Sequence, residues 1–311
     1  MDDYLLLLDV CHKEQRAIGL FDFHNGRSMH ALSEHGGLYE TLHFCARRHL
    51  DWSEYLRSLP AHPQQPPEGH PQGPLRPPLK PSDSLLAQVS EVTLNTPNTR
   101  QGWFYKGNGS LLRTDGEALM IPYHALSICS QPGVICVYLV DHFKQLRFVG
   151  FSLGHDIHDP LLSRQDASSC AQSRLRQCAI TPALILGELQ SSLSLNVRVE
   201  RQGVQLSYLS YRLDLQNWWA IRKYSQAFLE QHEQFLQPGM VHYVFHSACR
   251  RESELQLQHG DWLDLDCPEL ELGLSNQVIE EELLHLYPLE TQPARRNTQG
   301  SRPTRLRPPP Y

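Results

Sequence analysis

The pattern of apolar and polar positions predicts a β-rich domain over much of the chain. Residues Val134–Val140 form an unbroken apolar run with β-branched side chains, which is typical of a buried strand. A turn at residues 141–144 and a second apolar run at Leu146–Leu153 continue the pattern. Apolar and polar residues alternate in Leu195–Glu200 and in Val204–Tyr211, which predicts a hairpin with one face toward solvent.

One long helix is predicted between the hairpin and the last strands. Apolar side chains recur at helical intervals from Trp218 to Leu236, and Pro238-Gly239 ends the periodicity. Strand patterns return at Val241–Phe245 and at Trp262–Leu265. The expected fold class is therefore α+β and rich in strands.

Composition divides the chain into four segments. Residues 1–59 form a small α/β segment, and 60–81 are proline-rich, which predicts an extended linker or, alternatively, a ligand for proline-binding domains. The main domain is expected at 100–288. Residues 291–311 carry arginine among proline, glycine, threonine and serine, which predicts a disordered basic tail that aids solubility or contacts RNA, a membrane or a partner.

Charge and cysteine content narrow the functional classes. A net charge of -6 argues against a general DNA-binding surface. The apolar start, Tyr4–Val10, is much shorter than a membrane span and lacks the basic leader of a signal peptide. The eight cysteines contain no CxxC pair, so we expect reduced core thiols and a cytoplasmic protein rather than a zinc ribbon or a disulfide framework.

Two local motifs suggest chemistry that their context disfavours. Residues 150–154 match G-x-S-x-G, but the motif lies in a predicted strand instead of the strand-to-helix turn of a serine hydrolase. The neighbouring His155, Asp156, His158 and Asp159 are metal-ligand types. On a strand, however, adjacent side chains point to opposite faces, so these four cannot all converge on one ion.

Several segments, taken in order, resemble the fumarylacetoacetate hydrolase superfamily, in the branch of the 2-keto-3-deoxy sugar-acid (arabonate) dehydratases. The resemblance covers about residues 100–280 and implies a β-rich mixed-sheet core, a small N-terminal domain and often a homodimer. The segments that carry it are Trp103–Ser110, Ser130–Gly133, Gly150–Asp156, Ser173–Cys178, Gln237–His242 and His259–Asp261.

The resemblance also implies a Mg²⁺ site, and this sequence has lost most of its ligands. The superfamily holds the ion through a Glu-x-Glu pair and a third carboxylate, which are the hard oxygen ligands that Mg²⁺ prefers. Here the first position is Gln131, the second is Gly133, and only the third, Asp156, keeps its charge. Because two anionic side chains are missing, we expect weak Mg²⁺ binding or none.

The same resemblance supplies candidate site residues and two functional hypotheses. Lys106 and Arg174 are the catalytic candidates, while Arg176 and His242 are candidates for binding substrate; surface salt bridges or ordinary packing are the alternative explanations. The first hypothesis is a pseudoenzyme that binds a small anionic, keto-acid-like ligand or a protein partner. The alternative is an active metal-dependent dehydratase or hydrolase that acts on a 2-keto-3-deoxy sugar acid or a related keto acid.

Overall fold

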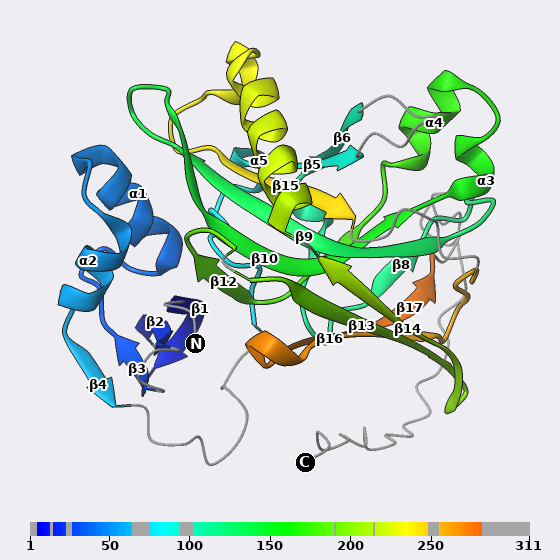
Figure 1. Ribbon diagram of the computed structural model, residues 1–311, viewed down its shortest axis with the longest axis horizontal. Coiled ribbons are helices and arrows are strands. Elements are labelled where there is room, and N and C mark those ends of the chain that lie inside the picture. The colour runs from blue at the N-terminus through cyan, green and yellow to red at the C-terminus, as the bar shows by residue number, and fades with distance from the viewer. Residues whose placement is uncertain are drawn as a thin grey trace, which may run out of the picture. The chain divides into compact units, whose positions relative to one another are not determined.

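The computed structural model describes residues 5–12, 15–22, 27–63, 75–93, 102–189, 191–213, 215–247 and 255–281. The predicted basic tail at 291–311 lies outside these residues, as does the middle of the proline-rich stretch. The chain is mixed α+β, as expected (Figure 1).

Most strands belong to one large mixed sheet, which runs in the order β4-β3-β2-β1-β12-β10-β9-β15-β5-β6, with β11 and β7 attached beside β10. Its strands are β1 (Leu5–His12), β2 (Gln15–Asp22), β3 (Arg27–Ala31), β4 (Ala61–Pro63), β5 (Ala87–Thr93), β6 (Gly102–Asn108), β7 (Leu112–Arg113), β9 (Cys129–Val140), β10 (Leu146–His158), β11 (Cys178–Ile180), β12 (Ala183–Leu186) and β15 (Val241–Ser247).

A second sheet runs in the order β14-β13-β16-β17-β8. Its strands are β8 (Leu119–Ile121), β13 (Leu193–Arg201), β14 (Val204–Leu213), β16 (Trp262–Cys267) and β17 (Leu272–Glu280). The predicted hairpin is confirmed as β13 and β14, joined at Gln202 and Gly203, which both have positive φ as a tight two-residue turn requires.

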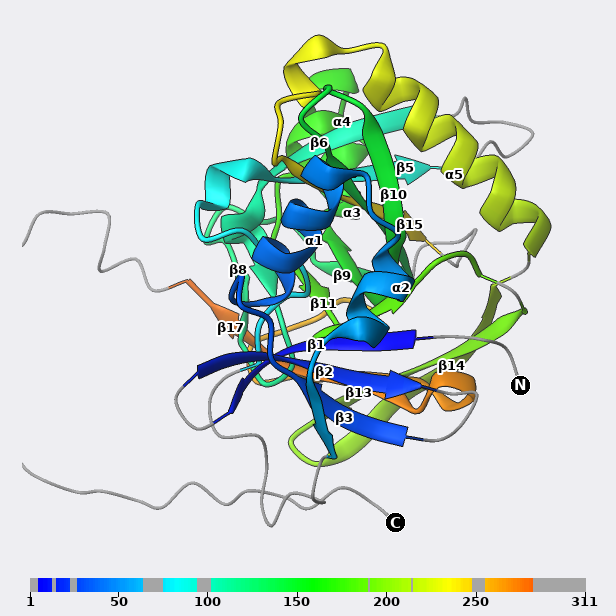
Figure 2. The ribbon, with the colours of Figure 1, turned by 90° about the vertical axis from the view of Figure 1, so that its left-hand side faces the viewer.

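Helices are few and cover the large sheet from different sides (Figure 2). The predicted long helix is confirmed as α5, although it ends at Glu230 and a short 3₁₀ turn follows before Gly239. The helices are α1 (Leu38–Arg48), α2 (Trp52–Ser58), α3 (Pro160–Ser163), α4 (Ala167–Ser173) and α5 (Leu215–Glu230), and the 3₁₀ turns are η1 (Ser84–Leu86), η2 (Gly109–Leu111), η3 (Glu233–Phe235) and η4 (Pro268–Leu270). Within the described residues, no helix is long and apolar enough to cross a membrane.

Strand β9 separates two hydrophobic cores, because it is buried on both faces. Val134, Cys136 and Tyr138 pack into one core together with the inner face of the second sheet and Trp218 of α5. Ile135 and Val137 alternate with them and pack into the other core, which α1 covers. The unbroken apolar run in the sequence is thus explained by burial on both sides.

The N-terminal segment shares the large sheet with the rest of the chain. β1 pairs with β12 through Leu6–Ile185 and its two neighbouring residue pairs. Part of the proline-rich stretch is also packed, since Leu79 is fully buried and Tyr243 donates a hydrogen bond to the Pro78 carbonyl at 2.8 Å. An extended spacer therefore does not describe residues 77–81.

Candidate functional site

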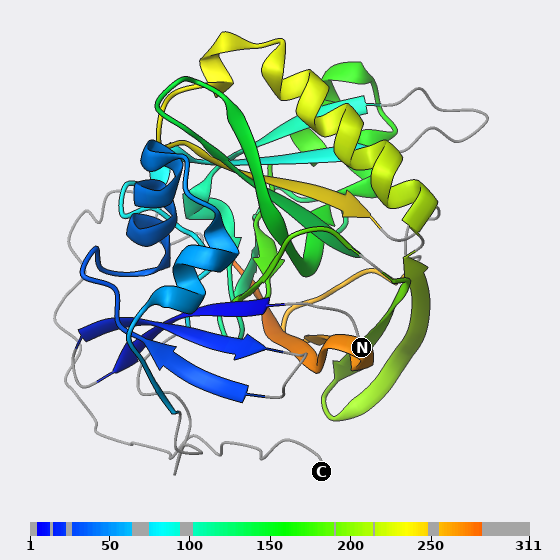
Figure 3. The same ribbon diagram turned by 60° about the vertical axis from the view of Figure 1, so that its left-hand side comes forward.

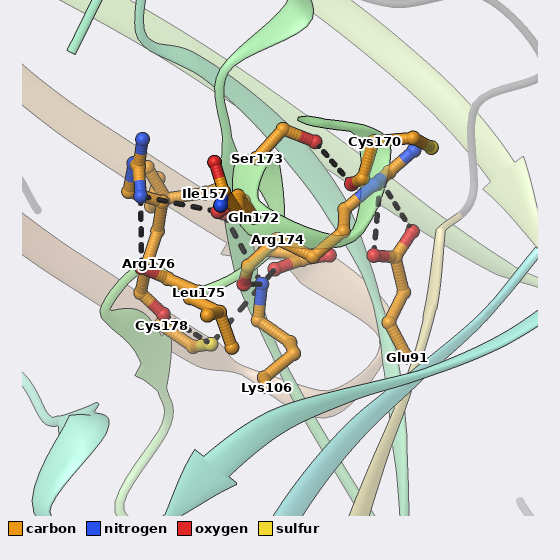
Figure 4. Close-up of polar contacts among 11 residues, drawn as sticks. Glu91, Lys106, Ile157, Cys170, Gln172, Ser173, Arg174, Leu175, Arg176 and Cys178 are labelled. Carbon is orange, nitrogen blue, oxygen red and sulfur yellow. Dashed lines mark hydrogen bonds and ion pairs between the residues drawn. The ribbon is translucent and has the colours of Figure 1, made fainter. Parts of the chain in front are cut away.

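The sequence-predicted residues Lys106 and Asp156 meet in the interior. Lys106 lies on β6 and Asp156 on β10, and the Lys106 Nζ is 2.6 Å from the Asp156 Oδ1. The ammonium also donates to the carbonyl of Arg174 at 2.7 Å and to the carbonyl of Ile157 at 3.2 Å (Figure 4). An ammonium has three N–H donors, so its hydrogen-bonding capacity is filled. Lys106 is buried, so it is not a surface lysine.

A second ion pair lies beside the first. Arg174 follows α4, and its Nη1 donates to the two carboxylate oxygens of Glu91 on β5 at 2.7 and 2.9 Å. Figure 4 shows the Glu91 carboxylate facing this guanidinium. The Cys178 thiol of β11 completes the group, 3.8 Å from the Asp156 Oδ1. We call Glu91, Lys106, Asp156, Arg174 and Cys178 the buried ion-pair network.

Glu91 is the residue that the sequence reasoning missed. It is the only charged residue in β5, a strand whose other members are small, apolar or neutral polar. A single carboxylate in such a strand indicates a buried partner of opposite charge, since charged side chains are seldom buried without one. Its ion pair with Arg174 excludes the alternative of a surface salt bridge for that arginine, because Glu91 is fully buried and Arg174 nearly so.

Burial and charge set the protonation of this network. Burial and the negative charge of Asp156 raise the pKa of Glu91 to about 8, against the opposing effect of Arg174 and Lys106. Burial alone would raise the pKa of Asp156, but Lys106 and Arg174 outweigh it and the pKa is lowered. Lys106 and Arg174 thus favour the ionised form of Asp156, whereas burial beside Asp156 makes Glu91 the more readily protonated carboxyl of the network.

The candidate metal positions lie beside Asp156 but do not fit Mg²⁺. The β9–β10 register places Gln131 opposite Asp156 and Gly133 opposite Gly154. Gln131 is neutral, and the Asp156 Oδ1 is occupied by an ammonium. No cluster of three histidine, cysteine or acidic side chains in the described residues has the arrangement of a metal site. The donor set is thus a poor match for an ion that prefers several anionic oxygens.

Gly133 cannot be converted into a ligand by substitution alone. A Cβ atom at this position would lie 2.0 Å from the carbonyl oxygen of His246 on the adjacent strand β15. A glutamate here would therefore force the two backbones apart. The double substitution Gln131→Glu with Gly133→Glu would therefore disturb the sheet instead of rebuilding a metal site.

The other candidate residues have separate partners. Arg176 is buried, its Nη2 lies 3.6 Å from the Asp159 Oδ2, and its Nη1 donates to backbone carbonyls. His242 lies on β15, where its ring Nε2 is hydrogen-bonded to the Phe235 carbonyl at 2.7 Å. The Arg174 side chain joins the network, whereas Arg176 contacts it only through its carbonyl, which accepts from the Cys178 Sγ at 3.6 Å. The structure thus brings together Lys106, Asp156 and Arg174.

The two local motifs have structural roles. Ser152 of the G-x-S-x-G match lies inside β10, and its hydroxyl bonds the Thr181 hydroxyl and the Ala183 carbonyl, both at 2.8 Å. His155 pairs with Ser130 at 2.7 Å, whereas Asp159 accepts the backbone N–H of Leu162 as the N-cap of α3. The four residues of the His–Asp cluster therefore diverge, as strand geometry predicts.

Buried histidines and Glu91 together predict how stability depends on pH. Burial lowers the pKa of His155 and His246 to about 3 and of His242 to about 4. Below about pH 6.5 these histidines bind protons in the unfolded state but not in the folded state, so the free energy of unfolding decreases as pH falls. Glu91, with its raised pKa, acts oppositely: the folded state holds a proton that the unfolded state has lost, so stability falls as pH rises from about 4.5 to about 8.

We therefore expect a stability maximum near neutral pH, measured as the free energy of unfolding in urea at several pH values. The three histidines dominate on the acid side and Glu91 on the alkaline side. Glu91→Gln, which resembles the protonated side chain, is expected to flatten the decline above pH 7 and to steepen the loss of stability between about pH 7 and pH 4.5, where Glu91 opposes the histidines. An unaltered alkaline decline in this variant would show that Glu91 does not titrate as described.

Comparison with known proteins gives a likeness in structure only. No protein-family profile and no curated protein matches the sequence. Among solved structures, 2-keto-3-deoxy-D-arabinonate dehydratase complexed with magnesium and 2,5-dioxopentanoate is 12% identical, with a TM-score of 0.63, and the match covers 89% of this chain and 99% of that one.

Other matches agree with this assignment. A hexagonal crystal form of 2-keto-3-deoxyarabinonate dehydratase is 13% identical, with a TM-score of 0.61 and the same coverage. A 2-hydroxyhepta-2,4-diene-1,7-dioate isomerase from Mycobacterium marinum is also 13% identical, with a TM-score of 0.54, over 89% of this chain and 99% of that chain. The chain therefore has the fold of the 2-keto-3-deoxy-D-arabinonate dehydratases, and its resemblance to the fumarylacetoacetate hydrolase superfamily is confirmed at the level of fold.

Proposed function

We propose that this protein is a pseudoenzyme, which keeps a dehydratase-like fold and acts by binding instead of by metal-dependent catalysis. One observation carries the proposal: the Asp156 carboxylate is neutralised by the buried ammonium of Lys106 at 2.6 Å. The charge that would attract a divalent cation is therefore already compensated from within the chain. The missing carboxylates at Gln131 and Gly133 support the same conclusion.

A protein partner is the ligand that the geometry favours. The side chains of Lys106, Asp156 and Glu91 are 0–2% exposed, so a substrate cannot reach them in this conformation. A small anion is the second candidate, and a different observation supports it. The Arg174 side chain is 10% exposed, which would let a carboxylate approach its guanidinium.

Titration with Mg²⁺ and with Mn²⁺ tests the loss of the metal site. The expected result is no binding heat and no increase in melting temperature with either ion. Asp156→Asn serves as the matched control, and it should respond to the ions as the natural protein does. Binding tighter than about 1 mM, or about −4 kcal/mol, that disappears in this variant would contradict the proposal and favour an active dehydratase.

The compartment is part of the same proposal. Among the cysteines that the structure describes, Cys45, Cys136, Cys170, Cys178 and Cys267 are free thiols, and all but Cys170 are buried. Unpaired thiols in this number support a reducing environment, and we propose the cytoplasm.

A further inference from the structure

Exposed apolar side chains gather between β8 and α3, which lie on the same side of the molecule (Figure 1). The Met120 N–H of β8 donates to the Gln177 Oε1 at 2.8 Å, which joins β8 to the segment after α4. The Leu126 N–H donates to the Oδ2 of Asp159, the N-cap of α3, at 2.8 Å. We call the exposed residues of this region the apolar patch: Met120 39%, Leu126 47%, Leu161 50%, Leu175 50% and Tyr123 57% exposed.

A small pocket opens beside Met120 within the patch. It contains about 220 Å³ of space, its open mouth included. Pockets for metabolites and drug-sized ligands usually have about 300–1,000 Å³. The space therefore suits one side chain of a partner better than a free small molecule. The apolar residues that line the pocket are Leu119, Ile121, Ile128, Ile157, Leu257 and Val278.

The pocket is separate from the buried ion-pair network. Ile157 lines the pocket, whereas its neighbour on β10, Asp156, bonds the Lys106 ammonium. Adjacent residues of a strand point to opposite faces of the sheet. A side chain in the pocket would therefore lie on the face of β10 opposite to the implied metal position.

Two carboxylates stand at one border of the patch. Glu280 lies opposite Ile121 in the β17–β8 register, and the Glu281 N–H donates to the Ile121 carbonyl at 2.9 Å. The Glu281 Oε2 accepts the Tyr123 N–H at 3.3 Å. Neither carboxylate forms an ion pair with another residue that the structure describes. The exposed Arg164 follows α3 at the opposite border, so the charge of the patch is negative at the Glu280–Glu281 end.

We propose that the apolar patch is the docking site of a partner protein, which inserts one aliphatic or aromatic side chain into the pocket and places lysine or arginine beside Glu280 and Glu281. The basic residue would stand about two to four positions from the inserted side chain on an extended segment. This inference rests on the proposed function, in which a protein partner is the ligand. Exposed apolar patches with polar borders mark interaction sites, where an anchor in a pocket supplies affinity and border charges set orientation.

The test uses the full chain and two matched sets of labelled synthetic peptides. Each peptide is about twelve residues long, with one leucine, isoleucine, methionine or phenylalanine at its centre among serine and glycine. The first set carries two lysines, two to four positions from the centre, and the second carries two glutamates there. Fluorescence polarisation should give a Kd below about 1 mM for peptides of the lysine set, and binding at least tenfold weaker for the glutamate set.

Two variants and one control locate the binding. Met120→Glu puts a charge at the mouth of the pocket and should weaken binding of the lysine set at least tenfold. Glu280→Lys with Glu281→Lys should reverse the preference toward the glutamate set, a gain that an unfolded protein could not show. Trp219→Lys is the control and should bind as the natural protein does. Trp219 is 45% exposed on α5, which Figure 3 shows in yellow at the top of the molecule, away from β17 in orange.

Three outcomes would overturn the proposal. The first is a lysine set that binds no more tightly than about 1 mM or no more tightly than the glutamate set. The second is unchanged binding in Met120→Glu or an unchanged preference in the double lysine variant. The third is self-association of the natural protein that Met120→Glu abolishes, since the patch would then belong to a second copy. None of these alters the Mg²⁺ titration, so failure of this docking site is distinct from failure of the proposed function.

Discussion

Replacing Lys106 by methionine is expected to lower the free energy of unfolding by about 3–5 kcal/mol, which is the usual cost of removing one partner from a buried ion pair. The substitution keeps most of the side-chain volume but leaves the Asp156 carboxylate without its counter-charge. It also removes the donor to the carbonyls of Ile157 and Arg174. Unfolding in urea, followed by circular dichroism, measures the effect.

Two further variants identify the cause of this loss. Lys223→Met changes an exposed lysine on α5, and its effect is expected to stay within about 0.5 kcal/mol. The double variant Lys106→Met with Asp156→Asn removes both charges, so it should regain part of the stability that Lys106→Met loses. A loss below about 1 kcal/mol in Lys106→Met would mean that Asp156 is compensated by something other than this ammonium.

Gly133→Ala is expected to have the second large effect, a loss of at least about 3 kcal/mol. The added Cβ meets the backbone of β15, which is a central strand hydrogen-bonded on both sides and cannot move away cheaply. Gly273→Ala is the matched control. Gly273 is also in a strand, but the nearest atom to its added Cβ is 3.6 Å away, which is ordinary contact.

Both glycine variants are compared by urea unfolding under the same conditions. Gly273→Ala should be nearly neutral. If Gly133→Ala were equally neutral, the close approach of β9 to β15 would not be a constraint, and the metal site could be rebuilt by substitution after all.

The sequence predicts the central strands well because their signal is local. The apolar run of β9, the alternation in β13 and β14, and the periodicity of α5 each depend on residues that are near one another in the chain. Lys106, Asp156 and Arg174 could be named from the resemblance, yet nothing local indicates that they form ion pairs. That outcome depends on which strands are neighbours and in which register.

Two features of the site could not be predicted for the same reason. Glu91 is distant in sequence from Arg174, and only the pairing of β5 with β15 and β6 brings its strand to the site. The interpretation of Gly133 as a lost metal ligand comes from the resemblance and stays a prediction. The His246 carbonyl oxygen lies where a Gly133 side chain would have to be. This contact depends on the neighbouring strand β15, which the sequence of β9 does not specify.

The pairing of β1 with β12 also has a thermodynamic consequence. The first strand shares a hydrogen-bonded ladder with β12, and its Leu5 and Leu7 pack in the same core as Leu184. The strands β1, β2 and β3 cannot lose their order without uncovering the edge of β12 in the large sheet. We therefore expect the N-terminal strands and the rest of the large sheet to melt as a single cooperative unit, although the composition of the chain suggests a boundary at residue 60.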